Sequence, residues 1–509
     1  MLNFAHCPII VEQEQAAMAR PAVVVIGAGL SGLAASVALR RESGADVVLV
    51  EAGEAAGGCC STVEVRGYTF NNGAVYVAVP SLLRSAFARL GLDFDADVAL
   101  ARIARPHATF LDDGTVVRLG GAGDSQVEGA DAQARTAMLQ DGLSALQRRW
   151  APIYRTLVEQ VLPAEPSALR TLARLWRHLP RMAGTVDRLI ARHFRDPGLQ
   201  AAVASTLLYT GMAPERIPAT QIVGLVALLE EGFHLPRGGM GAISQALLRA
   251  ARRAQVDVRC GRAVERIELG RDGVSGVILA DGERLRCDGV VATCAGFAAV
   301  ERLLPADAVP RALARRARRA PLSHRAVAIQ LGGAGGARAE AFIVNHVPSM
   351  REQGRLHQGG AETPRWLAYT CPTLVLPELA PPGRTIVELH APASGIASAG
   401  QWTREMTRAT VARYTAAVRA RLPGLEVEAM RVLDPVDFAR DRHLHEGALY
   451  GIAPGASPGR FFPHRTPLPG LYLAGQTTFP GYGVPSAILS GIQAAAAAAQ
   501  DLARPRARA

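Results

Sequence analysis

Lysine is absent from this 509-residue sequence, so all 56 of its basic residues are arginine. Against 45 acidic residues they give a formal net charge of +11, a surplus that would suit a nucleic-acid partner. Aromatic residues make up only 5% of the chain, however, and zinc-ligand spacing, RNP-like segments and helix-turn-helix signatures are missing. We therefore expect no nucleic-acid partner and attribute most of the charge to the arginine codons of a GC-rich genome.

Long hydrophobic runs are missing too, since none reaches the roughly 18 residues that a membrane-spanning helix needs. The first 20 residues lack a basic start and carry Glu12 and Glu14, so they do not predict a secretory signal. The sequence leaves open whether Met1 or Met18 is the start. Seven cysteines, an odd number in a chain without such a signal, favour reduced thiols and a cytoplasmic location.

The sequence also lacks the usual signatures of metal and nucleophile chemistry. We find no cluster of His, Cys, Asp and Glu with metal-ligand spacing and no Ser/His/Asp order, so we expect no metal and assign no catalytic side chain. A chain of 509 residues exceeds the size of one compact core, and we expect two domains. Its 49% hydrophobic and 20% charged residues are ordinary for a globular enzyme.

A nucleotide-binding unit is predicted where the N-terminal polar segment ends. The apolar run Ala22–Ile26 predicts a buried parallel strand, and the helical spacing over Leu30–Arg40 predicts a helix after it. Between them, Gly27, Gly29 and Gly32 form G-x-G-x-x-G. The first glycine allows the tight turn, the second lets a pyrophosphate approach the backbone, and the third lets the helix pack on the strand. The free N–H groups at the start of the helix then face the phosphates.

An acidic residue at the end of the second strand completes this unit. The strand predicted at Asp46–Val50 ends at Glu51, about 20 residues after the glycines, where a carboxylate accepts hydrogen bonds from ribose hydroxyls. NAD and FAD both carry that ribose, so Glu51 alone does not separate them. A second glycine pair, Gly57–Gly58, and the segment "GYTFNNG" at residues 67–73 follow closely.

These motifs resemble those of the two-dinucleotide-binding-domain flavoproteins, a group that includes amine oxidases, phytoene desaturases and retinol saturases. In that group the second glycine pair lies at the phosphates, and a G-[YF]-x-[FW]-[DN]-x-G segment places backbone close to the isoalloxazine ring. The resemblance therefore implies FAD, bound non-covalently. It covers residues 22–498 and is specific at four separate places.

The C-terminal segment "GLYLAGQTTFPGYGVPSAILSGIQAA" matches the same group. There the last strand ends at a glycine like Gly475, and the next helix aims its N-terminus at the flavin, where negative charge develops on reduction. In the middle of the chain, "PRGGM" and the helix and hairpin after it also match. The resemblance and the motifs together assign cofactor contacts to Gly27, Gly29, Leu30, Ser31, Gly32, Glu51, Ala52, Gly57, Gly58, Cys59, Gly73, Ala74, Val264, Gly475, Gln476, Gly483 and Val484.

Two positions distinguish this chain from the amine oxidases, which have Gly-Glu after the last strand and arginine after the glycine pair. Here Gly475 is followed by Gln476, and Gly58 by Cys59. "GGCC", "YGI" and "TPLPGLYLAGQ" are more similar to retinol saturases and carotenoid isomerases, and the ending also resembles that of bacterial phytoene desaturases. We place the chain in this branch without choosing among its members.

The adjacent thiols of Cys59 and Cys60 allow a redox interpretation, because a thiol near a helix terminus can be reactive. A disulfide between adjacent cysteines strains the peptide that joins them. We favour the interpretation that Cys59 is a small apolar filler at a position where relatives carry arginine.

The resemblance implies an α/β fold in which a Rossmann-type FAD-binding domain is interleaved with an α+β substrate domain. We expect an N-terminal extension at 1–20 and a flexible tail at 501–509. The FAD-binding domain is expected to comprise 21–107, 234–300 and 441–500. The substrate domain is expected to comprise 108–233, whose helices face a membrane, and 301–440.

The implied activity is hydride transfer at flavin N5 that desaturates, saturates or otherwise alters C–C double bonds of a long apolar substrate such as a carotenoid, retinoid or polyene. Two alternatives remain: oxidation of a smaller or carrier-tethered substrate of specialised metabolism, and redox-neutral cis–trans isomerisation. The electron acceptor, oxygen or quinone, stays undetermined. Aromatic residues beside the flavin motifs are our candidates for the substrate cavity: Tyr76, Tyr209, Phe233 and Tyr450.

A basic amphipathic segment at residues 169–197 suggests an anionic membrane surface as a partner. Its arginines recur at helical spacing with leucines and Trp176 between them, and such helices lie on anionic lipid. We expect Pro180 to end or kink the helix. A solvated helix face is the alternative interpretation. With no spanning helix, the expected location is the cytoplasm, peripherally on the inner face of the membrane.

Overall fold

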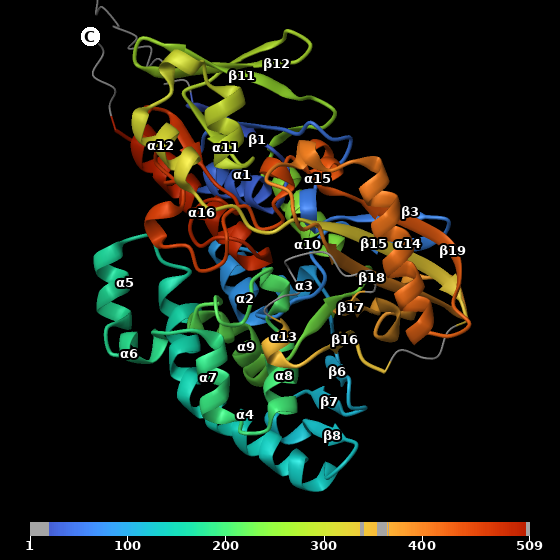
Figure 1. Ribbon diagram of the computed structural model, residues 1–509. Helices are drawn as coiled ribbons and strands as arrows, with labels where there is room; N and C mark the ends of the chain where they lie inside the picture. The colour runs from blue at the N-terminus through green and yellow to red at the C-terminus, as the bar shows by residue number, and fades with distance from the viewer. Residues whose placement is uncertain (1–19, 336–339, 354–363, 365, 505–509) are drawn as a thin grey trace, which may run out of the picture.

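A five-stranded parallel sheet forms the centre of the part predicted to bind a dinucleotide (Figure 1). The structure is a computed structural model that describes residues 20–335, 340–353, 364 and 366–504. In spatial order the strands are β10 (Asp257–Arg259), β2 (Asp46–Val50), β1 (Ala22–Ile26), β14 (Gly289–Ala292) and β20 (Leu471–Leu473). The two strands predicted at residues 22–26 and 46–50 are therefore confirmed with those bounds, and they pair in parallel.

Strand β1 is buried on both faces, as its continuous apolar run predicts. Val23 and Val25 pack in a core with the helices, whereas Val24 and Ile26 pack in a second core with a small antiparallel sheet. The helices are α1 (Leu30–Glu42), α10 (Gly241–Arg253) and α16 (Val484–Leu502), and α1 contacts both others. The small sheet, at the top of Figure 1, consists of β11 (Val264–Gly270), β12 (Gly273–Leu279) and β13 (Arg284–Arg286).

An eight-stranded mixed sheet forms the second large element of the fold. In spatial order it contains β19 (Glu426–Leu433), β15 (Ala326–Ala334), β18 (Arg384–Pro392), β17 (Leu367–Thr370), β16 (Ile343–Val347), β6 (His107–Leu111), β7 (Val116–Leu119) and β8 (Gln126–Glu128). Only the β16–β6 pair is parallel among these described strands. Helix α14 (Arg404–Arg421) packs against it at β15 and β17. Two further antiparallel pairs lie elsewhere: the hairpin of β3 (Thr62–Val65) and β4 (Tyr68–Asn71), and the pair of β5 (Leu100–Arg102) with β9 (His234–Pro236), which are far apart in the sequence.

Helices gather at the lower end of the molecule in Figure 1. They are α4 (Ala132–Arg155), α5 (Ala168–Leu175), α6 (Leu179–Met182), α7 (Val186–His193), α8 (Pro197–Ser205) and α9 (Val223–Glu231). Helix α8 contacts β6 and β16 and so joins this group to the eight-stranded sheet. The expectation for Pro180 was wrong: α5 already ends at Leu175, and Pro180 lies in the first turn of α6, where a proline needs no N–H partner.

The remaining described helices are short or lie at the edges of these layers. They are α2 (Pro80–Arg89), α3 (Phe94–Asp97), α11 (Gly296–Ala298), α12 (Arg311–Arg319), α13 (Met350–Gln353) and α15 (Pro435–Asp441). Among the residues that the structure describes, no helix combines the length and hydropathy needed to cross a bilayer.

Three segments far apart in the chain contribute strands to the parallel sheet: β1 and β2 precede residue 51, β10 and β14 lie between 257 and 292, and β20 follows 470. The domain boundaries stated above stay a prediction. Residues 1–19 of the expected N-terminal extension and 505–509 of the expected tail lie outside the described residues.

Buried neutral histidines are a feature of the eight-stranded sheet. Asn345 accepts a hydrogen bond from Trp366 Nε1 at 3.2 Å, so its amide NH₂ donates to His107 Nε2 at 2.7 Å. A protonated imidazole could not accept that bond. Burial lowers the pKa of His107, His346 and His390 to about 4. These side chains are therefore neutral in the folded protein at pH values where the unfolded chain already binds protons.

We predict that the protein loses stability as the pH falls from 6.5 to 4. In that window the unfolded histidines take up protons and the folded ones do not, so each contributes a loss of up to about 1.4 kcal/mol per pH unit. The buried Glu388, whose pKa is raised to about 7, has the opposite effect and offsets about one of the three histidines. Denaturant unfolding across this range measures the slope. His107→Gln should make the slope shallower, whereas His443→Gln, at an exposed position, should not. An unchanged slope in His107→Gln would contradict the prediction.

Candidate functional site: a dinucleotide cradle beside an aromatic cluster

The first glycine turn joins β1 to α1 and has two kinds of glycine in it. A Cβ on Gly32 would lie 1.8 Å from the carbonyl oxygen of Gly27, so the packing of helix on strand itself requires glycine there. Gly29 has extended backbone, with φ −73° and ψ −178°, and a Cβ on it would meet nothing within 4 Å. The packing of the protein therefore does not require glycine at position 29. A ligand that approaches this backbone closely would require it, because a Cβ would be in its way.

The second glycine pair packs directly on this turn. The N–H of Gly57 donates to the carbonyl oxygen of Ala28 at 2.8 Å, and a Cβ on Gly58 would lie 3.3 Å from the Gly29 Cα. Both have positive φ, +129° and +55°. Two backbone turns with little side-chain bulk therefore meet at the start of α1, where N–H groups lack helical partners.

Glu51 lies at the edge of the same turn, at the end of β2. Its Oε2 accepts from the N–H of Ala28 at 2.7 Å and its Oε1 from the N–H of Gly53 at 2.8 Å. A carboxylate has about four acceptor positions, so the half-buried Glu51 keeps capacity for ribose hydroxyls. The N–H of Arg262 donates to the Glu51 carbonyl oxygen at 2.8 Å, which places the start of β11, with Val264, beside this edge. Ala52, predicted as a contact, is exposed.

The C-terminal loop reaches the same place from the other end of the chain. Gly475 has φ +104°, and a Cβ on it would lie 2.9 Å from the carbonyl oxygen of Thr293 and 3.8 Å from Ser31 Oγ. Gly483, with φ +107°, precedes α16, which begins at Val484. The predicted contacts from both ends of the chain therefore meet at the carboxyl ends of parallel strands, where open α/β sheets bind ligands. These residues fit a dinucleotide.

The turn at residues 72–74 packs on the segment after the second glycine pair. A Cβ on Gly73 would lie 3.1 Å from the carbonyl oxygen of Cys59, and the N–H of Ala74 donates to that oxygen at 3.1 Å. Both neighbouring thiols are free, and Cys60 Sγ donates to the Met240 carbonyl oxygen at 3.3 Å. Burial raises the pKa of the Cys59 thiol. It also raises the pKa of the Cys60 thiol, to about 12. Neither is a thiolate at neutral pH, which favours the interpretation of Cys59 as a filler.

The four predicted substrate residues come together although they lie far apart in the sequence. The rings of Tyr76 and Phe233 are 4.4 Å apart. Burial raises the pKa of the Tyr450 phenol, and the phenols of Tyr482, Tyr76 and Tyr209 lie within electrostatic range and raise it further. Gly451 directly follows Tyr450, and a Cβ on Gly451 would lie 3.3 Å from the Cγ of Gln476. Gln476 belongs to the C-terminal glycine loop. The aromatic cluster thus adjoins the dinucleotide cradle.

Sequence reasoning missed one member of this cluster. Tyr482 stacks on Tyr450 with ring centroids 4.4 Å apart at 20°, and its hydroxyl donates to Gln221 Oε1 at 3.0 Å. Its position between Gly481 and Gly483, inside the predicted flavin loop, was the signal that could have identified it. Burial raises the pKa of Tyr482 and of Tyr76 to about 12, so the phenols are neutral.

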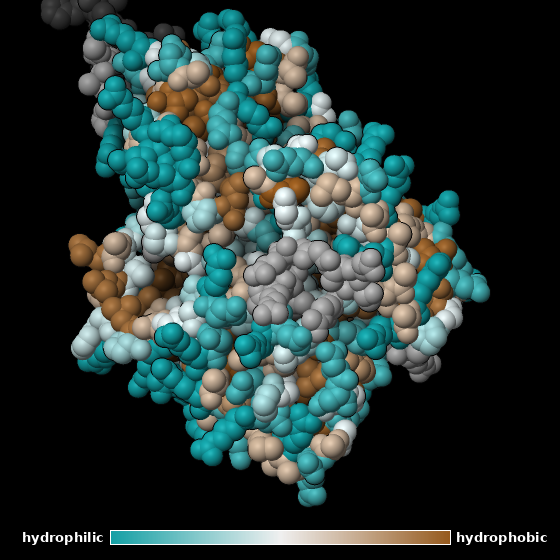
Figure 2. Space-filling model, in the orientation of Figure 1, coloured by the Kyte–Doolittle hydropathy of each residue, from teal (hydrophilic) through white to brown (hydrophobic). Residues whose placement is uncertain are grey.

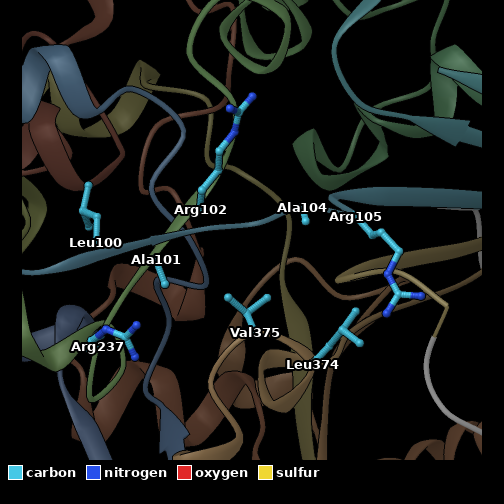
Figure 3. A pocket seen from close by; sticks show the side chains of 8 residues that line it. All are labelled: Leu100, Ala101, Arg102, Ala104, Arg105, Arg237, Leu374 and Val375. Carbon is cyan, nitrogen blue, oxygen red and sulfur yellow. The ribbon is translucent and has the colours of Figure 1, made fainter. Parts of the chain in front are cut away.

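A separate pocket of about 520 Å³ is lined by none of these residues (Figure 3). It is lined by Leu100, Ala101, Arg102, Ala104, Arg105, Arg237, Leu374 and Val375. The guanidinium groups of its three arginines point in different directions in Figure 3, and Arg237 pairs with Glu378 at 3.6 Å. They do not converge on one anion, and we assign this pocket no ligand. The described residues contain no group of three or more His, Cys, Asp and Glu side chains placed to hold a metal ion.

Comparisons with known proteins show the family to which the chain is similar. The model of the family described as flavin containing amine oxidoreductase matches residues 30–499. The phytoene dehydrogenase of Streptomyces griseus is 30% identical over 501 residues, which cover 93% of this chain and 94% of that protein. The hydroxyneurosporene desaturase of Cereibacter sphaeroides is 30% identical over 518 residues, covering 95% and 98%.

Solved structures share the fold at lower identity. An oxidoreductase from Methanosarcina mazei superposes with a TM-score of 0.60 at 16% identity, covering 92% of this chain and 99% of that one. Putrescine oxidase bound to putrescine has a TM-score of 0.60 at 16% identity, covering 94% and 98%. The predicted α/β architecture with a Rossmann-type FAD-binding domain is confirmed.

We predict that Gly29→Ala folds normally but binds FAD at least about tenfold more weakly, a loss of about 1.4 kcal/mol. The new Cβ has space in the protein and would occupy the volume the pyrophosphate needs. Titration of apoprotein with FAD, followed by flavin fluorescence, measures the affinity, and the melting temperature of the apoprotein tests the fold. Gly123→Ala, also in open space, is the matched control. Equal FAD affinity of Gly29→Ala and wild type would show that the ligand does not approach here.

Proposed function

We propose a function for this chain, which belongs to the flavin-containing amine oxidoreductase family. Within this family of FAD-dependent oxidoreductases, relatives similar over nearly the whole chain are a phytoene dehydrogenase and a hydroxyneurosporene desaturase. We propose that the present enzyme likewise alters C–C double bonds of a long apolar, polyene-like substrate. The resemblance to the desaturase group, stated from the sequence, is confirmed at the level of the family.

The observation that carries the proposal is the aromatic cluster beside the dinucleotide cradle. Tyr76, Phe233, Tyr450 and Tyr482 present large rings whose hydroxyl groups, where they have them, are neutral. Burial is the main cause of the raised pKa of the Tyr76 and Tyr482 phenols. Both side chains nevertheless keep part of their surface exposed. Partly exposed rings of this kind suit the wall of a space for an apolar molecule.

We propose that FAD is held non-covalently by the backbone of the two glycine turns, by Glu51 and by the Gly475 loop. Bound flavin would supply two-electron oxidation of the substrate, by removal of a hydride from one carbon and a proton from its neighbour. The chain's own task is to orient the polyene and keep water away from it. The neutral rings of Tyr450 and its neighbours do this without placing a charge against the substrate.

We predict that purified enzyme contains FAD that acid releases, and that anaerobic addition of phytoene or a related polyene bleaches the flavin. Product analysis then gives the bond and direction, and re-oxidation with oxygen or quinones identifies the acceptor. Tyr450→Phe should keep the flavin-reduction rate within about threefold, whereas Tyr450→Ala should lower it by about tenfold or more, because only the second removes the wall.

Three outcomes would contradict this proposal in different ways. Flavin reduction by small or carrier-tethered substrates but by no polyene would favour oxidation in specialised metabolism. Polyene conversion without any acceptor would favour isomerisation. A large loss in Tyr450→Phe would show that the phenol takes part in proton transfer and is more than a wall.

We also propose an anionic membrane surface as a partner that delivers the substrate. Four large apolar side chains are exposed on or beside α5 and α6: Leu169 (81%), Leu172 (51%), Trp176 (57%) and Leu179 (43%). Figure 2 shows hydrophobic side chains gathered at the edge of the molecule where α5 lies in Figure 1. Arg170, Arg177 and Arg181 are exposed among them. Apolar side chains with arginines between them match an interface of acyl chains and anionic headgroups.

We predict that the protein sediments with anionic vesicles at low salt and less at high salt, because exposed charges are screened within about 8 Å at physiological ionic strength. Leu172→Glu combined with Trp176→Glu should weaken binding by about tenfold or more. Met430→Glu, at another exposed apolar side chain, is the control and should bind as wild type does. Protein that stays in solution with anionic vesicles at low salt would refute the membrane proposal.

A further inference from the structure

A buried carboxylate connects the eight-stranded sheet to the flavin site. Glu388 on β18 is 3% exposed, and its two oxygens accept three hydrogen bonds. The N–H of Asn71 donates to Oε1 at 2.9 Å and the Asn71 Nδ2 to Oε2 at 3.3 Å, so one residue binds both oxygens. Gln330 Nε2 donates to Oε1 at 3.0 Å. All three partners are donors, the arrangement that an ionised carboxylate needs when it is buried.

The orientation of the Asn71 amide is determined by its other partners. Asn71 Oδ1 accepts from the N–H of Met240 at 2.9 Å, a backbone donor that cannot change its role. The Nδ2 must therefore face Glu388, because turning the amide would place an NH₂ against an N–H and an oxygen against a carboxylate. Asn71 is itself 3% exposed, and its carbonyl oxygen accepts from Gln330 Nε2. Every polar group of Asn71 thus has a specific partner.

Charge compensation for Glu388 is indirect. Arg431 NH1 donates to Gln330 Oε1 at 2.7 Å, and Gln330 in turn donates to Glu388. The bonds from Asn71 and Gln330 and the charge of Arg431 lower the pKa of Glu388, but burial outweighs them and the pKa is raised to about 7. A carboxylate kept at such a costly position depends on its three donors, so the loss of any one leaves a buried acceptor without a partner.

Asn71 passes this constraint on to the turn that follows it. The N–H of Asn72 donates to the carbonyl oxygen of Ser61 at 2.9 Å, and its Nδ2 donates to Ser61 Oγ at 2.8 Å. The N–H of Ala74 donates to the carbonyl oxygen of Cys59. The turn at 72–74 is therefore attached on one side to the segment after the second glycine pair and on the other, through Asn71, to Glu388. The resemblance places this turn close to the flavin ring.

We propose that Glu388 is a positioning residue of the flavin site, which holds the 72–74 turn in its FAD-accepting conformation through its paired hydrogen bonds to Asn71. This inference deepens the proposed function and rests on FAD binding. It assigns a role to a residue 317 positions away from Asn71 in the chain, on a strand that carries none of the predicted cofactor contacts.

The test is an exchange of the carboxylate and the amide. Asn71→Asp keeps the acceptor for Met240 but sets a second carboxylate against Glu388. Glu388→Gln keeps the acceptor for the Asn71 N–H and for Gln330 but sets an NH₂ against the Asn71 NH₂. The double variant, Asn71→Asp with Glu388→Gln, restores one donor facing one acceptor at every contact. Glu428→Gln is the control, because Glu428 bonds Tyr68 of the same hairpin but does not contact Asn71.

We expect each single variant to raise the FAD dissociation constant by about tenfold or more and to alter the visible spectrum of the bound flavin, and the double variant to recover both to within about threefold. Flavin fluorescence titration of each apoprotein gives the constants, and apoprotein melting temperatures are measured in parallel. Glu428→Gln should leave the constant and the spectrum unchanged.

Two results would overturn the inference while leaving the proposed function intact. One is wild-type FAD affinity and spectrum in both single variants, with only the apoprotein melting temperature lowered, which would make the pair structural. The other is a double variant no better than the single ones, which would show that the two side chains do not pair as described. Wild-type protein that binds no FAD would overturn both the proposed function and the inference.

Discussion

The close contact between α1 and β1 is the constraint on which the flavin-binding end of the molecule depends. A Cβ on Gly32 would lie only 1.8 Å from the carbonyl oxygen of Gly27, so any side chain at position 32 would overlap that oxygen. Helix α16 approaches equally closely, since a Cβ on Gly491 would lie 2.1 Å from the Ser31 carbonyl oxygen. Because backbone packs on backbone, the start of α1, the second glycine pair and the Gly475 loop share one small region. A ligand there meets N–H groups and few side chains.

The eight-stranded sheet contributes to this region in a different way. Side chains on its strands donate to and accept from the segment that leads into the 72–74 turn. Glu388 and Gln330 reach from adjacent strands of this sheet to Asn71. Buried hydrogen bonds of this kind are directional, so they fix one arrangement between two layers that apolar packing alone would allow to shift.

The aromatic cluster and the exposed apolar helices give the molecule two apolar surfaces with different surroundings. The phenols around Tyr450 are neutral and partly buried, whereas Trp176 is 57% exposed and lies among arginines. A long apolar molecule has little solubility in water, so an enzyme that acts on one needs both a wall to receive it and a surface where it arrives. This pairing is the physical basis for our proposal that polyene chemistry takes place at a membrane.

The sequence by itself determined the dinucleotide unit, because strand, turn and helix are consecutive there and their spacing sets their contacts. Ala22–Ile26 and the glycines at 27, 29 and 32 could be interpreted in this way, and the resemblance extended it to Gly475. Only the tertiary structure decided which distant groups meet. The sequence spacing of Asn71 and Glu388, or of Tyr450 and Tyr482, does not predict that they pair. These pairs form where separate sheets and loops pack together. Periodicity shows which face of an element is buried, but it does not show what that face will touch.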